Sequence, residues 1–117
     1  MQKKSSNSVR IFYPRFNKEE VLKRVTDNLE ALKSRLPLLL ESLFGSYAMG
    51  NYTVSSDIDL LVVYKGKERK DAYNTIKRAF KIPKLEPHVY TEAEFEGMRD
   101  TIKKMIKDGV VLYWEKE

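Results

Sequence analysis

The sequence lacks several residue types and patterns that define other classes of protein. Its 117 residues include no cysteine, which excludes disulfide bonds, zinc–thiolate sites and cysteine nucleophiles together. The longest apolar runs, Leu36–Leu40 and Ile58–Tyr64, are far too short to span a bilayer. Residues 1–8 are polar and basic with no apolar core segment, so we expect no signal peptide and a cytoplasmic location.

Positive charge exceeds negative charge, with 22 Lys and Arg residues against 17 Asp and Glu residues and a formal net charge of +5. This balance favours a polyanionic partner, a class that includes nucleotides, nucleic acids and acidic proteins. The basic residues are scattered along the chain, so a solvated surface rich in Lys and Glu explains the charge equally well. The length fits one domain over residues 1–117, of which residues 1–8 are expected to fray.

The hydrophobic pattern alternates between helical and strand-like segments. Helical spacing begins at Asn17, which can cap a helix, and ends before Pro37. Thr91 and Glu94 form a capping box for a second long helix. Pro87 cannot donate to a strand ladder, so its strand is expected at a sheet edge or at a bulge.

The remaining predicted elements are a short helix after Gly45, a helix over residues 68–80, and strands over residues 38–44, 57–64, 85–90 and 110–114. Alternation of this kind is typical of a small domain in which helices cover a sheet. We therefore predict an α/β (α+β) fold with a mixed sheet of about three to four strands.

Two carboxylates lie at the start of the second predicted strand. Side chains alternate between the faces of a strand, so Asp57 and Asp59 point the same way, about 7 Å apart along the backbone. Two like charges this close repel each other, and a divalent cation between them removes the repulsion. Alternatively, Asp57 caps a turn and Asp59 lies at an exposed strand edge. The apolar run that follows at once, Leu60–Val63, favours the metal site, because a carboxylate at the mouth of a buried strand needs a partner.

A glycine and a serine follow the first predicted strand. Gly45 lets the backbone approach a phosphate closely, and the start of the following helix offers free amide donors. The Ser46 hydroxyl can add a further donor to a phosphate oxygen. Alternatively, the pair forms an ordinary turn from strand to helix, with Ser46 as the cap. A hairpin-like return of the chain would place this turn beside the two carboxylates.

The complete motif resembles a known family signature. Gly45-Ser46, ten intervening residues and then Asp57-Ile58-Asp59 resemble the signature of the DNA polymerase beta-type nucleotidyltransferase superfamily. In the form Gly-Ser-Tyr-Ala-Met-Gly and Ser-Asp-Ile-Asp-Leu-Leu-Val, the motif is similar to that of the minimal nucleotidyltransferases, or MNT proteins. These proteins are often encoded beside HEPN-domain proteins in prokaryotes. The resemblance also extends to chain length and element order.

The resemblance implies a metal-dependent mechanism. Two Mg²⁺ ions would bind ATP and a hydroxyl acceptor, so that AMP is transferred by in-line attack on the α-phosphorus. Asp57 and Asp59 would hold the metal together with a third carboxylate on a later strand, for which Glu86 is the candidate. The family often has Asp at that position, so Glu86 departs from the pattern.

Further residues near the motif have more than one interpretation. Ser56 directly precedes the two carboxylates and either positions the loop or contacts the nucleotide. Glu86 is alternatively a solvent-exposed strand residue. His88, the only histidine, faces the same side of the strand and could complete the site, bind acceptor or phosphate, or be a hydrogen-bonded structural residue. Tyr47 and Tyr52 either pack in the fold or stack on a base.

Three functions are compatible with the sequence. The first is transfer of AMP from ATP to a hydroxyl acceptor, which the resemblance places on a HEPN toxin and which makes this chain the antitoxin of a type VII toxin–antitoxin pair. The second is a non-catalytic module that neutralises a partner by binding it, with only nucleotide binding retained. The third and weakest is nucleic-acid binding, which rests on charge alone. The nucleotide preference, the number of metal ions and the oligomeric state stay open.

Overall fold

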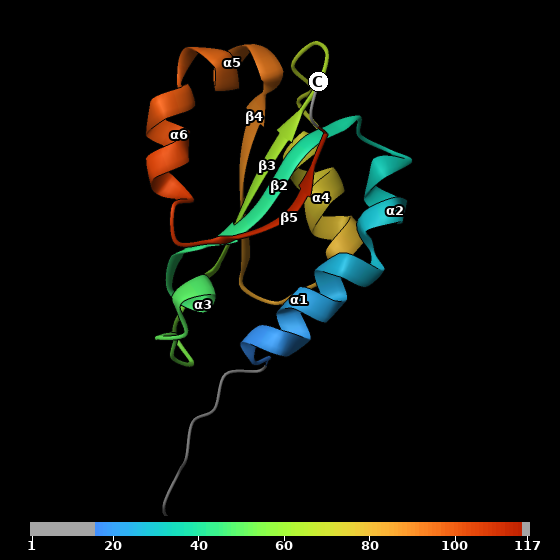
Figure 1. Cartoon of the computed structure of the whole chain (residues 1–117). Coiled ribbons are helices and arrows are strands. Elements are labelled where there is room, and N and C mark those ends of the chain that lie inside the picture. The colour runs from blue at the N-terminus through green and yellow to red at the C-terminus, as the bar shows by residue number, and fades with distance from the viewer. Residues whose placement is uncertain (1–15, 116–117) are drawn as a thin grey trace, which may run out of the picture.

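The structure is an α/β fold with a four-stranded mixed sheet between two layers of helices (Figure 1). The computed structural model describes residues 16–115, so the expected fraying of residues 1–8 lies outside the described part. The helices are α1 (Lys18–Asp27), α2 (Leu29–Lys33), α3 (Gly45–Met49), α4 (Ala72–Phe80), α5 (Glu92–Gly97) and α6 (Arg99–Met105). The strands are β2 (Leu38–Phe44), β3 (Ile58–Tyr64), β4 (Leu85–Thr91) and β5 (Val110–Trp114).

The strands lie in the order β4-β3-β2-β5. Strand β2 pairs antiparallel with both β3 and β5, whereas β3 pairs parallel with β4. Strand β4 is an edge strand, as Pro87 predicts, because proline has no N–H to donate to a second neighbour. The antiparallel pairing brings the end of β2 and the start of β3 together at one end of the sheet.

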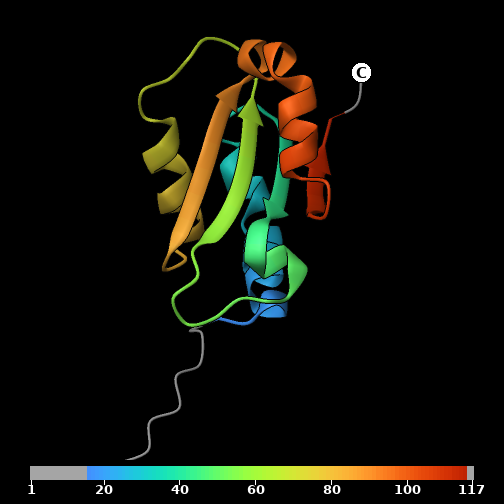
Figure 2. The same ribbon diagram turned by 90° about the vertical axis from the view of Figure 1, so that its left-hand side faces the viewer.

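Helices cover both faces of the sheet. Helices α1, α2 and α4 lie over one face, and α5 and α6 lie over the other (Figures 1 and 2). Consecutive residues of β3 face opposite layers, with Leu60 and Val62 in the core beneath the first group of helices and Leu61 and Val63 in the core beneath the second. Burial on both faces explains why this strand is an unbroken apolar run.

The two predicted helix caps are confirmed, whereas the start of α4 and the interiors of the first and last predicted helices differ from prediction. Asn17 and Thr91 each form the expected capping box. The first predicted helix is interrupted at Asn28, whose side chain donates a 2.8 Å hydrogen bond to the carbonyl of Arg24, a local bond that competes with the helical pattern. Helix α4 begins at Ala72 rather than at residue 68, and the last helix divides at Met98. Within residues 16–115, no helix combines the length and apolar character that crossing a membrane requires.

A carboxyl group is buried in the middle of the sheet without a partner. Glu41 on β2 is 0% exposed, and neither carboxyl oxygen has a hydrogen-bond partner. Its cross-strand neighbour on β3 is Val62, which belongs to the core beneath α1, α2 and α4. Burial in these apolar surroundings raises the pKa of Glu41 from 4.5 to about 8. At neutral pH the folded protein therefore holds this group protonated.

Glu41 should make the protein less stable as pH rises. The unfolded chain releases the proton near pH 4.5 and the folded chain near pH 8, so in this window the folded state binds more protons. The free energy of unfolding should fall with a slope of up to about 1.4 kcal/mol per pH unit. Urea denaturation across this window measures the slope.

The variant Glu41→Leu should abolish the slope and raise the free energy of unfolding at the upper end of the pH window. The control variant Glu19→Gln, at an exposed residue, should retain the slope. An unchanged slope in Glu41→Leu contradicts the assignment.

Candidate active site

The glycine–serine turn and Asp59 are in direct contact. Gly45 follows the end of β2 with a φ of +75°, a conformation that favours glycine. Phe44 pairs with Asp59 across the β2–β3 ladder. A Cβ added to Gly45 would lie 2.6 Å from Oδ2 of Asp59, closer than real atoms approach. A side chain at position 45 would therefore displace the Asp59 carboxylate from its present position.

Asp57 lies one residue before β3 and is exposed. The residue between the two carboxylates, Ile58, donates its N–H to the carbonyl of Lys84 at 2.8 Å. The ammonium group of Lys84 donates to the carbonyl of Ser55 at 3.2 Å. Lys84 thus binds the segment around Asp57 at two points, and it does so with a φ of +63°, which is unfavourable for lysine.

His88 contacts Asp59 from the neighbouring strand. Its Nε2 lies 3.1 Å from Oδ1 of Asp59, a hydrogen bond in the tautomer that carries the proton on Nε2. The imidazole also makes an edge-on contact with the ring of Phe44, with centroids 4.9 Å apart. These two contacts fix the orientation of the Asp59 carboxylate. They correspond to a hydrogen-bonded histidine, one of the alternatives that the sequence leaves open.

Glu86 is the residue of β4 that pairs with Asp59. Its carboxylate accepts a hydrogen bond of 2.9 Å from the hydroxyl of Tyr73 on α4. This bond raises the pKa of the Tyr73 phenol, burial raises it further, and the negative charges of Glu86 and Asp57 add to the increase. The Tyr73 hydroxyl therefore links α4 to the carboxylate of the edge strand β4.

The carboxylates fit a divalent cation, although they form no complete metal cage. Among residues 16–115, no group of three or more His, Asp and Glu side chains is assembled to hold a metal ion. Asp57 and Asp59 offer carboxylate oxygens, the hard ligands that Mg²⁺ prefers. Mg²⁺ usually keeps water and substrate phosphate oxygens as its other ligands, so a site of one or two carboxylates is typical for it. Gly45 keeps the space beside Asp59 free of a side chain.

The remaining predicted residues have structural contacts. Ser56 accepts a 2.9 Å hydrogen bond from the N–H of Thr53, which folds the loop before β3 into a tight turn. Tyr47 and Tyr52 stack on each other with centroids 4.0 Å apart, which supports packing for both. Ser46 lies half-buried in α3 directly after Gly45. Nucleotide contacts by Ser46 and Ser56 stay predictions.

Sequence reasoning missed two residues of the site. Tyr73 and Lys84 contact the carboxylate region from the α4 helix and from the loop before β4. Neither belongs to a motif, and each lies in a stretch of ordinary helix or loop composition. Only the parallel pairing of β3 with β4, with α4 between them in the chain, brings these side chains to the carboxylates.

Comparison with known families identifies this arrangement. The model of the nucleotidyltransferase domain family matches residues 22–113. This chain belongs to that family. The match includes the Gly45 turn, both aspartates and Glu86, so the nucleotidyltransferase motif and its surrounding fold are matched as one unit. No curated protein sequence matches the nucleotidyltransferase at a significant level.

Solved structures share the fold of this nucleotidyltransferase. A Sulfolobus solfataricus protein described as a nucleotidyltransferase has 25% identity and a TM-score of 0.56, with 84% of each chain covered. A toxin–antitoxin structure with AMP-PNP has 17% identity and a TM-score of 0.53, with 78% of this chain and 74% of that chain covered. A complex of tri-AMPylated Shewanella oneidensis HEPN toxin with MNT antitoxin has 15% identity and a TM-score of 0.53, with 84% and 73% covered.

Substitution of Gly45 tests the contact with Asp59. Gly45→Ala should lower nucleotidyl transfer by on the order of a hundredfold, because the added Cβ displaces the Asp59 carboxylate. Gly66→Ala is the matched control, since Gly66 has a φ of +94° but nothing within 4 Å of an added Cβ. Both variants bear a similar backbone cost, so thermal melts should match while transfer rates differ. Equal transfer rates in the two variants would show that the close approach is not needed.

Substitution of Lys84 tests whether its ammonium group positions Asp57. Lys84→Gly keeps the left-handed backbone and the carbonyl but removes the contact with Ser55. The variant should need a higher Mg²⁺ concentration for half-maximal activity, because the Asp57 segment loses one attachment. Lys81→Gly is the matched control, since Lys81 in the same loop has a φ of +53°. A shift of equal size in both variants assigns the effect to the loop backbone and contradicts the positioning role.

Proposed function

We propose that this nucleotidyltransferase transfers AMP from ATP to a hydroxyl group on a HEPN-domain partner, with Mg²⁺ as the metal. The single observation that carries the proposal is the contact between the Gly45 turn and the Asp59 carboxylate. The backbone of the Gly45 turn can approach a phosphate, and the Asp59 carboxylate can hold a cation. The contact places these two groups side by side. Triphosphate and metal would therefore be bound at one point, as nucleotidyl transfer requires.

The residues around the carboxylates divide the remaining tasks. Asp57 and Asp59 would hold Mg²⁺, which when bound neutralises phosphate charge and stabilises the pyrophosphate leaving group. Gly45 and Ser46 would contact the triphosphate. His88 keeps Asp59 in a single orientation through its 3.1 Å contact.

Glu86 would act on the acceptor. Glu86 lies on the edge strand beside Asp59. Its carboxylate already accepts a hydrogen bond from the Tyr73 hydroxyl. The hydroxyl of an acceptor could take the place of the Tyr73 hydroxyl and donate the same hydrogen bond to Glu86. Glu86 would then be positioned to remove the acceptor's proton as a general base. The longer Glu side chain, compared with Asp, extends to the edge of the sheet, where an acceptor from another protein can approach.

Structural neighbours support the choice of nucleotide and partner. One neighbour of the same fold is a toxin–antitoxin structure with AMP-PNP, an ATP analogue. Another is an MNT antitoxin in complex with a tri-AMPylated HEPN toxin. Together with the motif, these neighbours favour ATP as the donor and a HEPN toxin as the acceptor, with this chain as the antitoxin.

A second candidate function is neutralisation of the partner by binding alone. The observations in its favour are that the described residues assemble no group of three metal-binding side chains and that the Glu86 carboxylate is hydrogen-bonded to Tyr73. Under this alternative, nucleotide binding would be retained without transfer.

The double variant Asp57→Asn, Asp59→Asn distinguishes the two functions. It should abolish transfer of label from α-labelled ATP to a HEPN-domain protein supplied as the acceptor and should release that toxin from inhibition in cells. The fold should persist, since Asp57 is exposed and Asp59 is half-buried. Full neutralisation by the double variant would favour binding alone, and absence of label transfer by the wild type would reject the proposed activity.

A further inference from the structure

A tyrosine of the chain itself lies at the carboxylate proposed to activate the acceptor. The Tyr73 hydroxyl donates to Oε1 of Glu86 at 2.9 Å. A phenol hydroxyl is a nucleophile of the class that accepts nucleotidyl groups. The usual explanation for such a contact is structural, with tyrosine holding a carboxylate in place. That explanation does not require the hydroxyl to be accessible.

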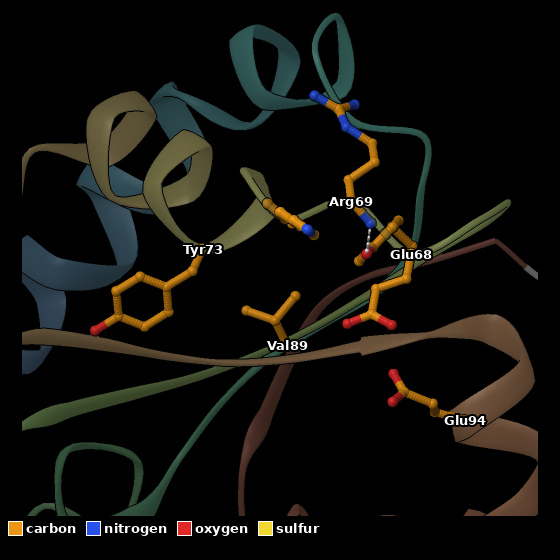
Figure 3. A pocket seen from close by; sticks show the side chains of 8 residues that line it. Glu68, Arg69, Tyr73, Val89 and Glu94 are labelled. Carbon is orange, nitrogen blue, oxygen red and sulfur yellow. Dashed lines mark hydrogen bonds between the residues drawn. The ribbon is translucent and has the colours of Figure 1, made fainter.

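Tyr73 is accessible. Its side chain is 37% exposed, and it forms one end of a surface cavity of about 230 Å³ between α4 and β4. Figure 3 shows the ring extending over β4, with Val89 beneath the middle of the cavity and Glu68 and Glu94 at the opposite end. Because the residue is exposed, a nucleotide can approach the phenol without unfolding of the helix that carries it.

A positive charge lies near the same ring. The ammonium group of Lys77, one turn further along α4, is 5.7 Å from the centroid of the Tyr73 ring. A cation at this position attracts the anionic phosphate groups of a nucleotide toward the phenol. The hydroxyl thus has a carboxylate to accept its proton and a cation near its point of attack.

We propose that Tyr73 is an acceptor in cis, so that the enzyme transfers a nucleotidyl group from a nucleoside triphosphate to its own Tyr73 hydroxyl. The proposal rests on the proposed nucleotidyl transfer and adds a modification site to it. The phenol oxygen of Tyr73 bonds to the α-phosphorus, the bond between the α-phosphorus and the bridging oxygen breaks, and pyrophosphate leaves. The phenol proton passes to the Glu86 carboxylate and then to solvent.

This reaction needs no partner molecule, because the acceptor belongs to the same chain as the carboxylates. Because Tyr73 and the carboxylates are parts of one fold, no encounter between molecules is needed to place the acceptor. The rate should therefore be first order in enzyme, so the fraction of enzyme labelled per unit time should not change on dilution.

The test is incubation of the full chain alone with Mg²⁺ and α-labelled ATP, followed by intact mass measurement and peptide mapping. One adenylyl group on Tyr73 is expected, and Tyr73→Phe should carry none. Tyr113→Phe is the matched control and should be labelled like the wild type. Tyr113 also donates to a glutamate, Glu115, but it lies on β5 at the opposite edge of the sheet. Label that persists on Tyr73→Phe, or label on any other residue only, overturns the proposal.

A mixture of two variants separates reaction in cis from reaction in trans. Tyr73→Phe retains the carboxylates, and Asp59→Asn retains the acceptor. Transfer in cis predicts no label on either chain. Label on the Asp59→Asn chain means transfer between molecules and overturns the proposal.

A parallel reaction with the HEPN partner keeps the two proposals distinguishable. Label on the partner with none on Tyr73 overturns the inference and leaves the proposed function intact. Label on Tyr73 with none on the partner supports the inference and overturns the choice of partner. Absence of label on both, with folding verified by circular dichroism, overturns both proposals.

Discussion

The close approach of the Gly45 backbone to the Asp59 carboxylate is the constraint on which the rest of the site depends. Two conditions produce it: an antiparallel β2–β3 register that places Phe44 opposite Asp59, and a residue without a Cβ at the point of contact. The register in turn depends on the burial of β3 on both faces. A slip by one residue would turn every side chain of β3 to the opposite face of the sheet and so into the other core. The apolar core thereby positions a polar site at its margin.

Two of the three carboxylates at the candidate site have side-chain hydrogen-bond partners. Asp59 is within hydrogen-bond distance of His88, and Glu86 accepts a hydrogen bond from the hydroxyl of Tyr73. These contacts orient the carboxylates and spread their charge, so they limit the repulsion among three acidic groups at one edge of the sheet.

The most strongly shifted acid lies away from the site. Glu41 is fully buried without a partner, whereas Asp57, Asp59 and Glu86 reach the surface. Perturbed pKa values often mark functional sites, but here the shift has a purely structural cause, which is desolvation in the core beneath α1, α2 and α4. The candidate site is therefore inferred from the geometry around Gly45 and not from the titration of an acid.

The sequence by itself determined the α/β fold, the strand that carries the motif and the proximity of Gly45 to Asp59, because these follow from local periodicity and from one short antiparallel return. The helix breaks at Asn28 and Met98 escaped prediction, since apolar spacing continues across both residues. Only the tertiary structure decided the partners of the carboxylates. The contacts of His88 with Asp59 and of Tyr73 with Glu86 join residues 29 and 13 positions apart in the chain. Such contacts depend on the register of the parallel β3–β4 pair and on the packing of α4, which no local pattern encodes.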